Sequence, residues 1–473
     1  MNLKIPKDVY DILDTLEKAG YEAYIVGGCV RDFYLGSKPH DWDITTNAKP
    51  DEVKKLFKKT IDTGIQHGTV TAMVNNEGYE ITTYRIDGEY EDNRRPSSVE
   101  FTGDLVKDLE RRDLTFNAMV MDKEGNIKDF FDGKKDLDNK IVRAVGNPNK
   151  RFQEDALRMM RAIRFAAKFG FELESELYEA IKSNAHLIKN VSYERIESEI
   201  TKILTSNHPE KFLDLYTTGI TKYIMPEFDK MMETEQNTPW HLYSVGMHTI
   251  KAVCAIENDR NLRWAMLLHD VGKPDAKTTD EKGQDHFYGH NENGTDIASE
   301  IMKRMKFSTK DLKEIQSLIF LHDIHYKKMP KIRKFVADYG IDFARRLIKI
   351  QRADIEAQSS YNYEEKVESV NILESNIETV YKDGSAIRLT DLKINGNDLM
   401  KIGYKGKEIG DELYRLREIV LQSPNLNTKE DLLRRSKSNY DKTHTLDDII
   451  KTKTSNKKNN EENVVLKDQI NRD

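Results

Sequence analysis

Residues 24–45, YIVGGCVRDFYLGSKPHDWDIT, decide the fold of the first third of this chain. The β-branched and aromatic residues of Glu22–Val26 predict a strand that ends at the Gly27-Gly28 pair. A short helix is expected over Val30–Leu35, and Asp41–Thr45 predicts a second strand. The stretch therefore predicts a strand–turn–helix–strand unit in a mixed α/β domain.

The second predicted strand carries two aspartates, Asp41 and Asp43. Residues two apart in a strand face the same side, roughly 6.5–7 Å between their Cα atoms, so both carboxylates converge. Two Mg²⁺ ions can relieve their repulsion and clamp the attacking and leaving oxygens of a phosphoryl transfer. Glu80, on a later predicted strand, could complete this metal site or could equally be a solvated strand glutamate.

The glycine turn upstream suits a triphosphate. The backbone N–H of Gly28 lies at a helix N-terminus, where anions bind well, and Arg31 is placed to add charge-assisted contacts. Taken singly, an Asp-x-Asp pair or a Gly-Gly turn is common and carries little information. The ordered set of glycine turn, Arg31-Asp32 and Asp-x-Asp is what favours nucleotide chemistry.

The remaining head predictions are local. Asp8–Ala19 predicts a short amphipathic helix, and Val70–Val74 should pair with Tyr79–Tyr84 across the turn-rich residues 75–78. From about residue 150 the glycines thin out and apolar residues follow helical spacing, so the rest of the chain should be largely helical.

Composition sets broad limits on the chain. Its 473 residues exceed what one core supports, so two to four domains are expected. A charged fraction of 33% and a mean hydropathy of −0.71 indicate a soluble protein, with no apolar window near the roughly 18 residues of a membrane span. The net charge of −6 weighs mildly against nucleic-acid binding, although only the local field at a binding surface matters.

Two further features point to the cytoplasm. The chain has two cysteines, Cys29 and Cys254, far apart and outside any CxxC pattern, which argues against a disulfide framework or a cysteine zinc site. The N-terminal residues mix acidic and basic side chains and lack the apolar core of a signal peptide.

Residues 153–168, QEDALRMMRAIRFAAK, predict one helix with a core-facing stripe and a charged face. A charged face is usually solvated and salt-bridged. Base reading is the alternative, because cytosine and adenine both present an amine donor beside a ring-nitrogen acceptor. A carboxylate and a guanidinium one turn apart, such as Asp155 and Arg158, satisfy both bases. Uracil and guanine would leave buried groups unpaired, at about 1–3 kcal/mol each.

A family resemblance joins these motifs. The segments IVGGCVRDFYLG, HDWDITTNAKP, GIQHGTV, YEITTYR, DGEYEDNRRPSSVEF and RRDLTFNAM resemble the head of bacterial-type (class II) CCA tRNA nucleotidyltransferases. That head belongs to the DNA polymerase β superfamily and is shared with bacterial poly(A) polymerases. The resemblance runs from Tyr24 to about Phe171. It implies template-independent addition of CCA to the tRNA 3′ end from CTP and ATP, with release of pyrophosphate.

The resemblance also implies residue roles. Asp41 and Asp43 would hold Mg²⁺, and Asp155 and Arg158 match the Glu-Asp-x-x-Arg motif that selects CTP and ATP. The remaining positions that match nucleotide-contacting residues of the family are Arg112, Arg161 and Arg164. Residues 89–99 match a loop that accompanies addition of the terminal A, which favours a full CCA-adder or an A-adder over a CC-adder. An A-adding enzyme or a poly(A) polymerase remains the nearest alternative.

A third group of residues lies in a helical insert. WHLYSVGMHT, LLHDVGKP and IQRADIEAQ resemble the H…HD…D signature of HD metal-dependent phosphohydrolases, with His248, His269, Asp270 and Asp354 as implied ligands. Such ligands suit a divalent cation that generates a hydroxide nucleophile. His290 matches a further ligand of dinuclear members, and His286 or His322 could assist. A histidine in a helix is more often a core residue, and hydrolysis itself stays open.

The end of the folded chain resembles the family's C-terminal segment over Asp391–Leu433, which is expected to hold the tRNA elbow while the 3′ end reaches the head. Two other functions remain open: an HD phosphohydrolase whose head is an RNA-binding platform, and a binding module alone. No membrane contact is expected, and the enzyme is expected to be a monomer or a homodimer. The predicted architecture is α+β, a polymerase-β-like head followed by all-α parts. Its divisions are 1–140 head, 141–205 neck, 206–240 body, 241–360 HD-type domain, 361–435 tail and 436–473 largely disordered polar tail.

Overall fold

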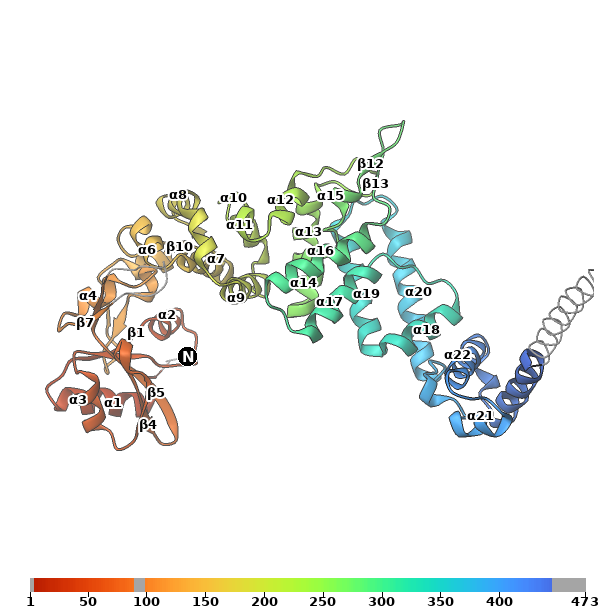
Figure 1. The fold of residues 1–473 in the computed structure, drawn as a ribbon. Helices are drawn as coiled ribbons and strands as arrows, with labels where there is room; N and C mark the ends of the chain where they lie inside the picture. The colour runs from red at the N-terminus through yellow and green to blue at the C-terminus, as the bar shows by residue number, and fades with distance from the viewer. Residues whose placement is uncertain (1–3, 89–97, 445–473) are drawn as a thin grey trace, which may run out of the picture. The chain divides into compact units, whose positions relative to one another are not determined.

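The computed structural model describes residues 4–88 and 98–444. The chain divides into two compact units, one formed by Met1–His322 with Ala353–Tyr361, the other by Asp323–Arg352 with Asn362–Asp473. Its main sheet lies in the first third, drawn red to orange in Figure 1, and the described residues that follow are mostly helical. This agrees with the predicted α+β class.

A seven-stranded sheet forms the head, in the order β3-β4-β5-β2-β1-β8-β9. All neighbouring pairs are antiparallel except β2 and β5, which run parallel. The strands are β1 (Ala23–Val26), β2 (Ile44–Thr46), β3 (Thr60–Gly64), β4 (Thr69–Val74), β5 (Glu77–Thr83), β8 (Val120–Met121) and β9 (Ile127–Lys128).

The predicted hairpin is confirmed, with a tighter turn than expected. β4 and β5 pair from Thr69 opposite Thr82 to Val74 opposite Glu77, so only Asn75 and Asn76 lie in the turn. Both asparagines have positive φ, 50° and 67°, as a two-residue type I′ turn requires. Asparagine tolerates this conformation better than most residues, which explains the Asn-Asn pair.

The helices of the head cover this sheet and follow the predicted amphipathic pattern. α1 (Lys7–Lys18) confirms the predicted first helix and buries Val9, Ile12, Leu13 and Leu16. The other helices are α2 (Gly28–Tyr34), α3 (Pro50–Leu56), α4 (Leu105–Glu110) and α5 (Gly133–Asp138). β6 (Arg85–Asp87) pairs with β7 (Val99–Phe101). The intervening residues 89–97, which make up most of the loop predicted to accompany A addition, lie outside the described residues.

The single helix predicted over residues 153–168 is wrong, because the chain breaks at Asp155. α6 (Pro148–Glu154) ends there with an extended backbone, and α7 (Leu157–Phe169) begins two residues later. The Asp155 carboxylate accepts the backbone N–H of Leu157 at 3.0 Å, so a short acidic side chain stabilises a new helix start. The predicted core stripe is confirmed, since its five residues are fully buried: Ala156, Met159, Met160, Ile163 and Ala167.

Helices continue the first compact unit. Its core includes the fully buried Trp264, which donates its indole N–H to Thr201 at 2.8 Å. Two short pairs of strands accompany them, β10 (Ile141–Val142) with β11 (Glu172–Leu173) and β12 (Thr278–Thr279) with β13 (Asp285–His286). The helices are α8 (Ser175–Asn184), α9 (Tyr193–Leu204), α10 (Phe212–Thr217), α11 (Thr221–Ile224), α12 (Pro226–Glu233), α13 (Val245–Ala255), α14 (Arg260–Leu268), α15 (Lys273–Ala276), α16 (His290–Arg304) and α17 (Thr309–Leu321).

The second compact unit contains α18 (Met329–Tyr339), α20 (Tyr363–Lys382), α21 (Gly396–Ile402) and α22 (Lys407–Gln422). α19 (Ile341–Ala357) begins in this unit, and its residues from Ala353 belong to the first. Leu399, Leu416, Val420 and Leu432 form the centre of the core around α21 and α22.

Part of the predicted disordered tail is folded. The structure describes a helix over residues 429–444, in which Ser436 is fully buried. Tyr440 packs its ring 5.0 Å from that of Tyr404, and Gly403, with φ 128°, leaves room for it. Tyr440, the buried Ser436 and a hydrogen bond from Asn439 to Glu412 at 2.8 Å therefore anchor a polar segment whose composition predicts no core contact. Residues 445–473 lie outside the described residues. None of the described helices combines the length and apolar character that a membrane span requires.

Candidate active site and candidate metal centre

The two head aspartates directly precede β2 rather than lying within it. The backbone of Asp43 already pairs with β1, because the N–H of Val26 donates to the Asp43 carbonyl at 2.9 Å. β2 pairs with β5 with Ile44 opposite Ile81, so Asp43 and Glu80 occupy the next position along the two strands. The structure thus brings Glu80 alongside the Asp-x-Asp pair.

The electrostatics of Asp43 reflect its acidic neighbours. Its pKa is raised above the ordinary value, first because surrounding atoms displace water from the carboxylate. Arg112 opposes this shift, whereas Glu80 and Asp41 add to it. Both Asp41 and Asp43 keep an exposed side. The head therefore gathers negative charge at an accessible strand end, where a cation would lower the energy of all three carboxylates.

Gly27 controls the turn before α2. Its φ of 85° is in the left-handed region, and a Cβ atom there would lie 3.0 Å from Nη1 of Arg112. Gly28 then begins α2, and a Cβ on it would come 3.4 Å from Nη2 of Arg31. Both glycines allow arginine side chains to approach the backbone closely, which places guanidinium groups beside the predicted triphosphate position.

Arg31 is buried, with most of its polar contacts made inside the head. Its Nη1 donates to Asn117 Oδ1 at 2.6 Å and its Nε to Asp32 Oδ1 at 2.8 Å. The guanidinium lies 5.1 Å from the ring of Phe165 and 5.2 Å from that of Phe169. No role was predicted for Asn117, although the RRDLTFNAM motif contains it. Its amide fixes the orientation of Arg31.

Asp155 and Arg158 lie at the junction of α6 and α7 and not within one continuous helix, but they remain one turn apart, because the backbone N–H of Arg158 donates to the carbonyl of Asp155 at 3.0 Å. The second carboxylate oxygen of Asp155 pairs with Nη2 of Arg195 at 2.9 Å. Arg158 pairs with Glu154 at 2.6 Å and donates to the carbonyl of Arg111 at 2.9 Å. Both predicted base-reading groups are thus held in defined orientations by neighbouring polar groups.

The charged face of α7 is salt-bridged, as charged helix faces usually are. Arg161 contacts Asp113 at 2.6 Å, and Arg164 contacts Glu199 of α9 at 2.7 Å. Burial alone would raise the pKa of Asp113, but Arg161, followed by the hydrogen bond from Asn117, lowers it to about 2. Residue reasoning gave Asp113 no role, although RRDLTFNAM contains it beside Arg112.

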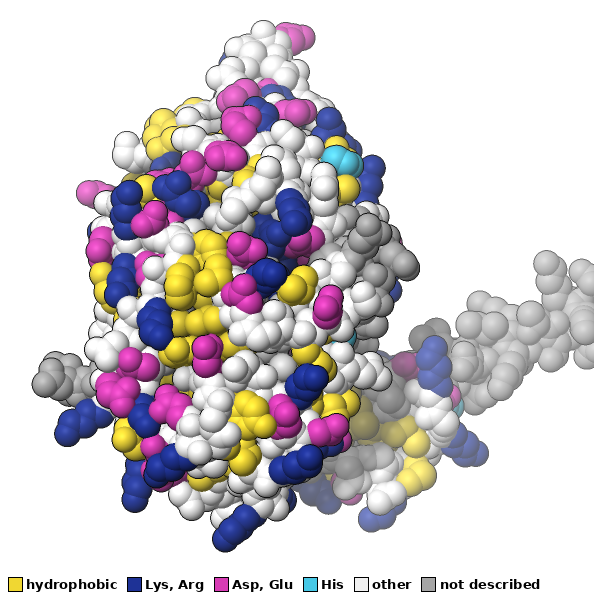
Figure 2. All heavy atoms as spheres, turned by 90° about the vertical axis from the view of Figure 1, so that its left-hand side faces the viewer, with side chains coloured by type: hydrophobic (Ala, Val, Ile, Leu, Met, Phe, Trp, Pro, Cys, Tyr) yellow, Lys and Arg dark blue, Asp and Glu magenta, His cyan; other side chains and the backbone are white. Residues whose placement is uncertain are grey.

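Positive side chains gather around one ring. The guanidinium carbons of Arg31, Arg161 and Arg164 lie 5.1, 5.9 and 4.1 Å from the centre of the Phe165 ring. Burial lowers the pKa of Arg112, which also interacts with Asp43. This local concentration contrasts with the face shown in Figure 2, where basic and acidic side chains are intermixed around a group of hydrophobic ones.

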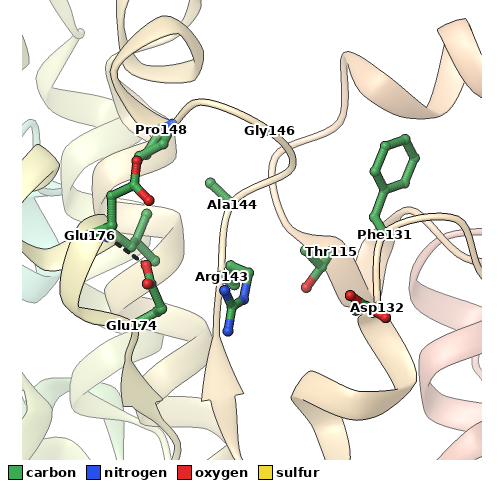
Figure 3. A pocket seen from close by; sticks show the side chains of 10 residues that line it. Thr115, Phe131, Asp132, Arg143, Ala144, Gly146, Pro148, Glu174 and Glu176 are labelled. Atoms are coloured by element: carbon green, nitrogen blue, oxygen red, sulfur yellow. Dashed lines mark hydrogen bonds between the residues drawn. The ribbon is translucent and has the colours of Figure 1, made fainter.

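A pocket of about 200 Å³ lies elsewhere in the first unit, beside α6 and α8. In Figure 3, Arg143 lies between Glu174 and Glu176 on one side and Thr115 and Asp132 on the other. The backbone N–H of Leu177 donates to Glu174 at 2.9 Å, which caps α8. None of the lining residues is a predicted site residue, so this pocket is separate from the candidate active site.

The histidines of the helical insert meet in two adjoining groups. The first joins His248 of α13, His269 at the end of α14 and Asp354 of α19. The second joins Asp270, His290 at the start of α16 and His322 at the end of α17. Within each group the ligand atoms lie within 4.8 Å of one another. Among the described residues, these are the two groups of three that could hold a metal ion in this way.

All four imidazoles are oriented by the backbone. Each places Nδ1 against a carbonyl oxygen, at 3.3 Å for His248 and Ala357, and at 2.7 Å for His269 and Met266. The corresponding distances are 2.8 Å from His290 to Phe287 and 2.6 Å from His322 to Ile319. A protonated Nδ1 that donates to these carbonyls leaves Nε2 as the ligand atom of every ring.

Asp270 joins the two groups. Its Oδ2 lies 3.2 Å from Nε2 of His269 and 3.7 Å from that of His248. Its Oδ1 lies 3.7 Å from Nε2 of His290 and 3.8 Å from that of His322. The carboxylate therefore turns one oxygen to each group, which is the arrangement of a bridging ligand.

The buried polar atoms test whether metal ions fit. Oδ1 of Asp270 is buried and makes no hydrogen bond among the described residues, whereas Oδ2 is paired with Nζ of Lys273 at 2.7 Å and lies 3.2 Å from Nε2 of His269. Buried groups of this kind are costly unless they are paired or bind a metal. Imidazole nitrogen and carboxylate oxygen are suitable donors for divalent transition metals. The residues present therefore fit two ions.

Three polar residues beside this centre were missed by sequence reasoning. Lys273 places Nζ 2.7 Å from Oδ2 of Asp270 and 3.0 Å from Oε1 of Gln236. Nε2 of His241 lies 3.4 Å from the same ammonium. Lys273 and His241 stand in quoted motifs, HDVGKP and WHLYSVGMHT, but only the fold shows that they meet. His286 points elsewhere, pairing with Asp280 at 3.0 Å.

Two glycines hold α16 against this centre. A Cβ on Gly272 would lie 2.2 Å from the carbonyl oxygen of His290 and 2.5 Å from the backbone nitrogen of Gly294. Gly294 in turn faces the backbone of Gly272. Because neither residue has a side chain, the helix that starts with His290 can contact the turn after His269 and Asp270 directly.

Family models match three stretches of the chain. Residues 23–143 match a poly A polymerase head domain. Residues 170–232 match a model described as a probable RNA and SrmB-binding site of polymerase A, and residues 241–358 match an HD domain.

Individual proteins are similar as well. A CCA-adding enzyme of Lactobacillus helveticus is 36% identical over 87% of this chain and 92% of its own length. One from Ligilactobacillus salivarius is 50% identical over 48% of this chain, and the chain spans only 56% of that relative. The crystal structure of the Bacillus stearothermophilus CCA-adding enzyme in complex with CTP superposes with a TM-score of 0.68 at 27% identity, covering 93% of this chain and 98% of that one.

Proposed function

The chain belongs to the family of CCA-adding enzymes, and we propose that it adds CCA to the 3′ end of tRNA from CTP and ATP, releasing pyrophosphate. The observation that carries this proposal is the opposition of charges in the head. Asp41, Asp43 and Glu80 gather where β2 begins, level with the middle of β5, and Arg112 approaches them across the Gly27 turn. Acidic and basic groups face the position where a nucleoside triphosphate would react.

We assign Asp41 and Asp43 to Mg²⁺, with Glu80 as a third carboxylate. When bound, two such ions neutralise charge on the attacking and leaving oxygens of a phosphoryl transfer. The backbone of Gly28 and the guanidinium of Arg31 would hold the triphosphate, with Arg112 behind them. Arg31 has five N–H donors: Nη1 contacts Asn117, and Nε and Nη2 both lie 2.8 Å from Asp32 Oδ1, so two donors would be left for a phosphate.

Base selection belongs to the α6–α7 junction in this proposal. The carboxylate of Asp155 would accept the exocyclic amine of cytosine or adenine, while Arg158 would donate to the ring nitrogen. Arg195 and Glu154 now hold these two groups and would keep them aligned as the base enters. Arg161 and Arg164, fixed by Asp113 and Glu199, would contribute positive potential around the nucleotide.

The domain roles follow from the same proposal. We infer a head over 1–140, a neck over 141–205, a body over 206–240, an HD-type domain over 241–360 and a tail over 361–435. The three matched ranges, 23–143, 170–232 and 241–358, support this division. We assign the tail to the tRNA elbow through phosphate contacts, which predicts salt-sensitive binding. A cytoplasmic location and a monomer or homodimer complete the proposal.

One assay tests the product directly. The purified full chain is incubated with CTP, ATP and Mg²⁺ and with tRNA transcripts that end before CCA or after CC, and with an unrelated RNA. A CCA-adding enzyme extends the first transcript by three nucleotides and the second by one, and then stops. Extension of the CC-ending transcript alone would identify an A-adding enzyme, and continued A addition would identify a poly(A) polymerase.

The buried histidine groups support a second activity. We propose that the HD domain hydrolyses a phosphoester with two divalent ions, held by the groups of His248, His269 and Asp354 and of Asp270, His290 and His322. Such ions lower the pKa of bound water and so supply hydroxide near neutral pH. The chain's own residues orient the ligands: four backbone carbonyls fix the imidazoles, and Asp270 spans the two positions.

The two sites can be separated by mutation. Mn²⁺-dependent phosphohydrolysis by the full chain should survive Asp41→Ala and disappear with Asp270→Ala. Loss in both variants would place the hydrolysis in the head, and no hydrolysis in the wild type would reject this second activity. If hydrolysis greatly exceeds CCA addition, the HD domain carries the main activity of the chain.

A further inference from the structure

We propose that α14 of the HD-type domain holds the base-reading junction of α6 and α7 in place, and that Glu197, Thr201 and Arg260 are positioning residues for nucleotide selection. The inference rests on the proposed addition of CCA and concerns how its base selection is supported. None of these three residues belongs to a motif of the head or to the H…HD…D signature. The HD-type domain thereby gains a part in nucleotide selection that does not depend on hydrolysis.

Helix α9 carries polar side chains on two opposite faces. On one face Arg195 pairs with Asp155 at 2.9 Å, and Glu199, one turn later, pairs with an arginine of α7 at 2.7 Å. Glu197 and Thr201 are also one turn apart, and residues two apart on a helix point about 200° away from each other. They therefore lie on the face opposite Arg195. α9 packs against both α7 and α14 and is drawn between them in Figure 1.

A chain of hydrogen bonds joins this second face to α14. The hydroxyl of Thr201 accepts the indole N–H of Trp264 at 2.8 Å and donates to Oε1 of Glu197 at 2.7 Å. Nη2 of Arg260 donates to the same carboxylate oxygen at 2.8 Å. Because a hydroxyl has a single proton, its donation to Glu197 leaves a lone pair for the indole, so both bonds can form together. The first two turns of α14 therefore hold the side of α9 that faces away from Asp155.

The C-terminal end of α9 is held from the same direction. Nη1 of Arg263 donates to the carbonyl of Leu204 at 3.2 Å, and Nδ2 of Asn258 donates to the carbonyl of Thr205 at 2.7 Å. The last carbonyls of a helix have no partner within the helix, so these bonds satisfy groups that would otherwise need water. The side contacts and the end contacts together restrict both rotation and sliding of α9.

The start of α14 is itself anchored. Arg260 pairs with Asp311 of α17 at 3.2 Å, and its guanidinium carbon lies 4.6 Å from the centre of the Phe307 ring. Trp264, which is fully buried, packs edge-to-face on the same ring at 5.0 Å. Both residues that contact α9 are thus fixed by the segment that leads into α17. Support of this kind is stiff enough to be passed on to α9.

The consequence for base selection follows from geometry. Hydrogen bonds weaken steeply when their angle or length departs from the optimum, so a carboxylate distinguishes an amine donor from a carbonyl only if it cannot turn away. Asp155 is kept in place by Arg195, and Arg195 is carried by α9. If α9 lost the contacts of Thr201 and Glu197, Arg195 would gain freedom and Asp155 with it. Cytosine would then bind less well, and uracil would be rejected less strongly.

The experiment measures the ratio of kcat/KM for CTP to that for UTP in the full chain, by single-nucleotide addition to a tRNA transcript that lacks CCA. Thr201→Val keeps the shape of the side chain and removes both hydrogen bonds. The ratio should fall about threefold to tenfold, the shift that loss of one hydrogen bond produces. Arg260→Ala should lower it in the same direction, and Thr201→Ser, which keeps the hydroxyl, should restore it.

A matched variant separates positioning from general loss of stability. Arg304→Ala breaks an ion pair of the same domain, made with Glu227 at 2.8 and 3.0 Å. Urea unfolding should show that it destabilises the chain about as much as Arg260→Ala does. A partly unfolded enzyme loses turnover with both nucleotides equally, so Arg304→Ala should leave the ratio unchanged.

A double-mutant comparison tests the route through Arg195. In a chain that carries Arg195→Ala, the added Thr201→Val should change the ratio little, because the residue through which Thr201 acts is already gone. Independent, additive effects would overturn this route.

Equilibrium dialysis of labelled CTP and UTP gives the same ratio without turnover. Normal incorporation with a ratio that Thr201→Val and Arg260→Ala leave unchanged would overturn the inference and leave the proposed function standing. A chain that binds CTP in preference to UTP, loses that preference in the two variants and incorporates neither nucleotide would reject the proposed function alone. Absence of both incorporation and preference in the wild type would reject both.

Discussion

The head and the HD domain both bring acidic side chains together for a proposed metal-dependent phosphoryl reaction, yet they are built differently. In the head, Asp41 and Asp43 precede a strand and stay exposed, and the basic group that acts on Asp43 is Arg112. In the HD domain, His269 and Asp270 are 1% exposed and surrounded by other ligands. One site is an open edge, whereas the other is a buried, prearranged cage.

Charge compensation explains the difference. The pKa of Asp43 is raised, because loss of water and like charges outweigh Arg112. Burial would also raise the pKa of Asp270, but His269 and Lys273 reverse the effect and hold that pKa well below its ordinary value. The HD cage thus balances its charges internally, whereas the head keeps a negative excess that an incoming metal–nucleotide complex would neutralise. The exposed carboxylates of the head are suited to ions that arrive with the substrate. The buried ligand groups of the HD domain are suited to ions that stay bound.

The largest expected effect tests the open site. Asp43→Ala should lower CMP and AMP incorporation by about 10³-fold or more, because metal coordination contributes several kcal/mol to phosphoryl transfer and each 1.4 kcal/mol is tenfold in rate. The measurement is incorporation of labelled CTP into a tRNA transcript that lacks CCA. Asp51→Ala, an exposed acid on α3, is the matched control and should incorporate normally. Wild-type-like incorporation by Asp43→Ala would remove the carboxylate pair from the reaction.

The second prediction tests the cage. Asp270→Ala removes the carboxylate shared by both groups, so bound Mn²⁺ should fall from about two ions per chain to less than one. Asp354→Ala removes a ligand of the first group only and should leave about one ion. Metal analysis after dialysis gives the stoichiometry, and both variants should retain CCA addition. Equal losses in the two variants would show that the groups do not bind separately.

Patterns with a fixed period were predictable from the sequence, and contacts between distant segments were not. The hairpin of β4 and β5, helix α1 and the buried stripe of α7 follow from periodicity and turn chemistry. The break at Asp155 was missed because helical spacing continues on both sides of a side chain that caps the following helix. The folded segment around Tyr440 was missed because its few contacts, made by Ser436, Asn439 and Tyr440, leave no mark on a polar composition.

The functional sites show the same division between local motifs, which were predictable, and contacts between distant segments, which were not. Asp41, Asp43 and the four ligands of the H…HD…D signature stand in short motifs, and their residue types indicate metal chemistry. Asp113, Asn117, Lys273 and Gln236 carry no such local signal. Asp113 gains a role only because α7 brings Arg161 to it, and Asn117 because α2 brings Arg31 to it. Lys273 gains one because the turn after Asp270 brings its ammonium to Gln236. Partners of this kind depend on tertiary packing, which a single sequence does not report.

The third prediction tests base selection at the helix junction. Asp155→Asn keeps an oxygen that can accept the Leu157 N–H but adds an amide donor, which can pair with uracil. Discrimination for CTP over UTP should fall about tenfold to a hundredfold, since each unpaired buried group costs about 1–3 kcal/mol. Competition between CTP and UTP in single-nucleotide addition measures the ratio. Glu174→Gln, which alters the corresponding cap of α8, should leave it unchanged, and an unchanged ratio for Asp155→Asn would contradict base reading.

The smallest expected effect concerns the pairing that holds the basic side of the head. The folded pKa of Asp113 is about 2, below its ordinary value of 3.8, so its charged form contributes stability that is complete above about pH 4 and is lost as the pH falls toward 2. This lowering of the pKa corresponds to roughly 2.4 kcal/mol, and the partial exposure of Arg161 reduces it to about 1–2 kcal/mol. Asp113→Asn should therefore destabilise the chain at pH 7 and have a smaller effect at pH 3, as measured by urea unfolding. Asp51→Asn is the exposed control. An equal loss at both pH values would mean that Asp113 acts through packing, and the contrast between a charge-paired scaffold and an open acidic edge would then not hold for the head.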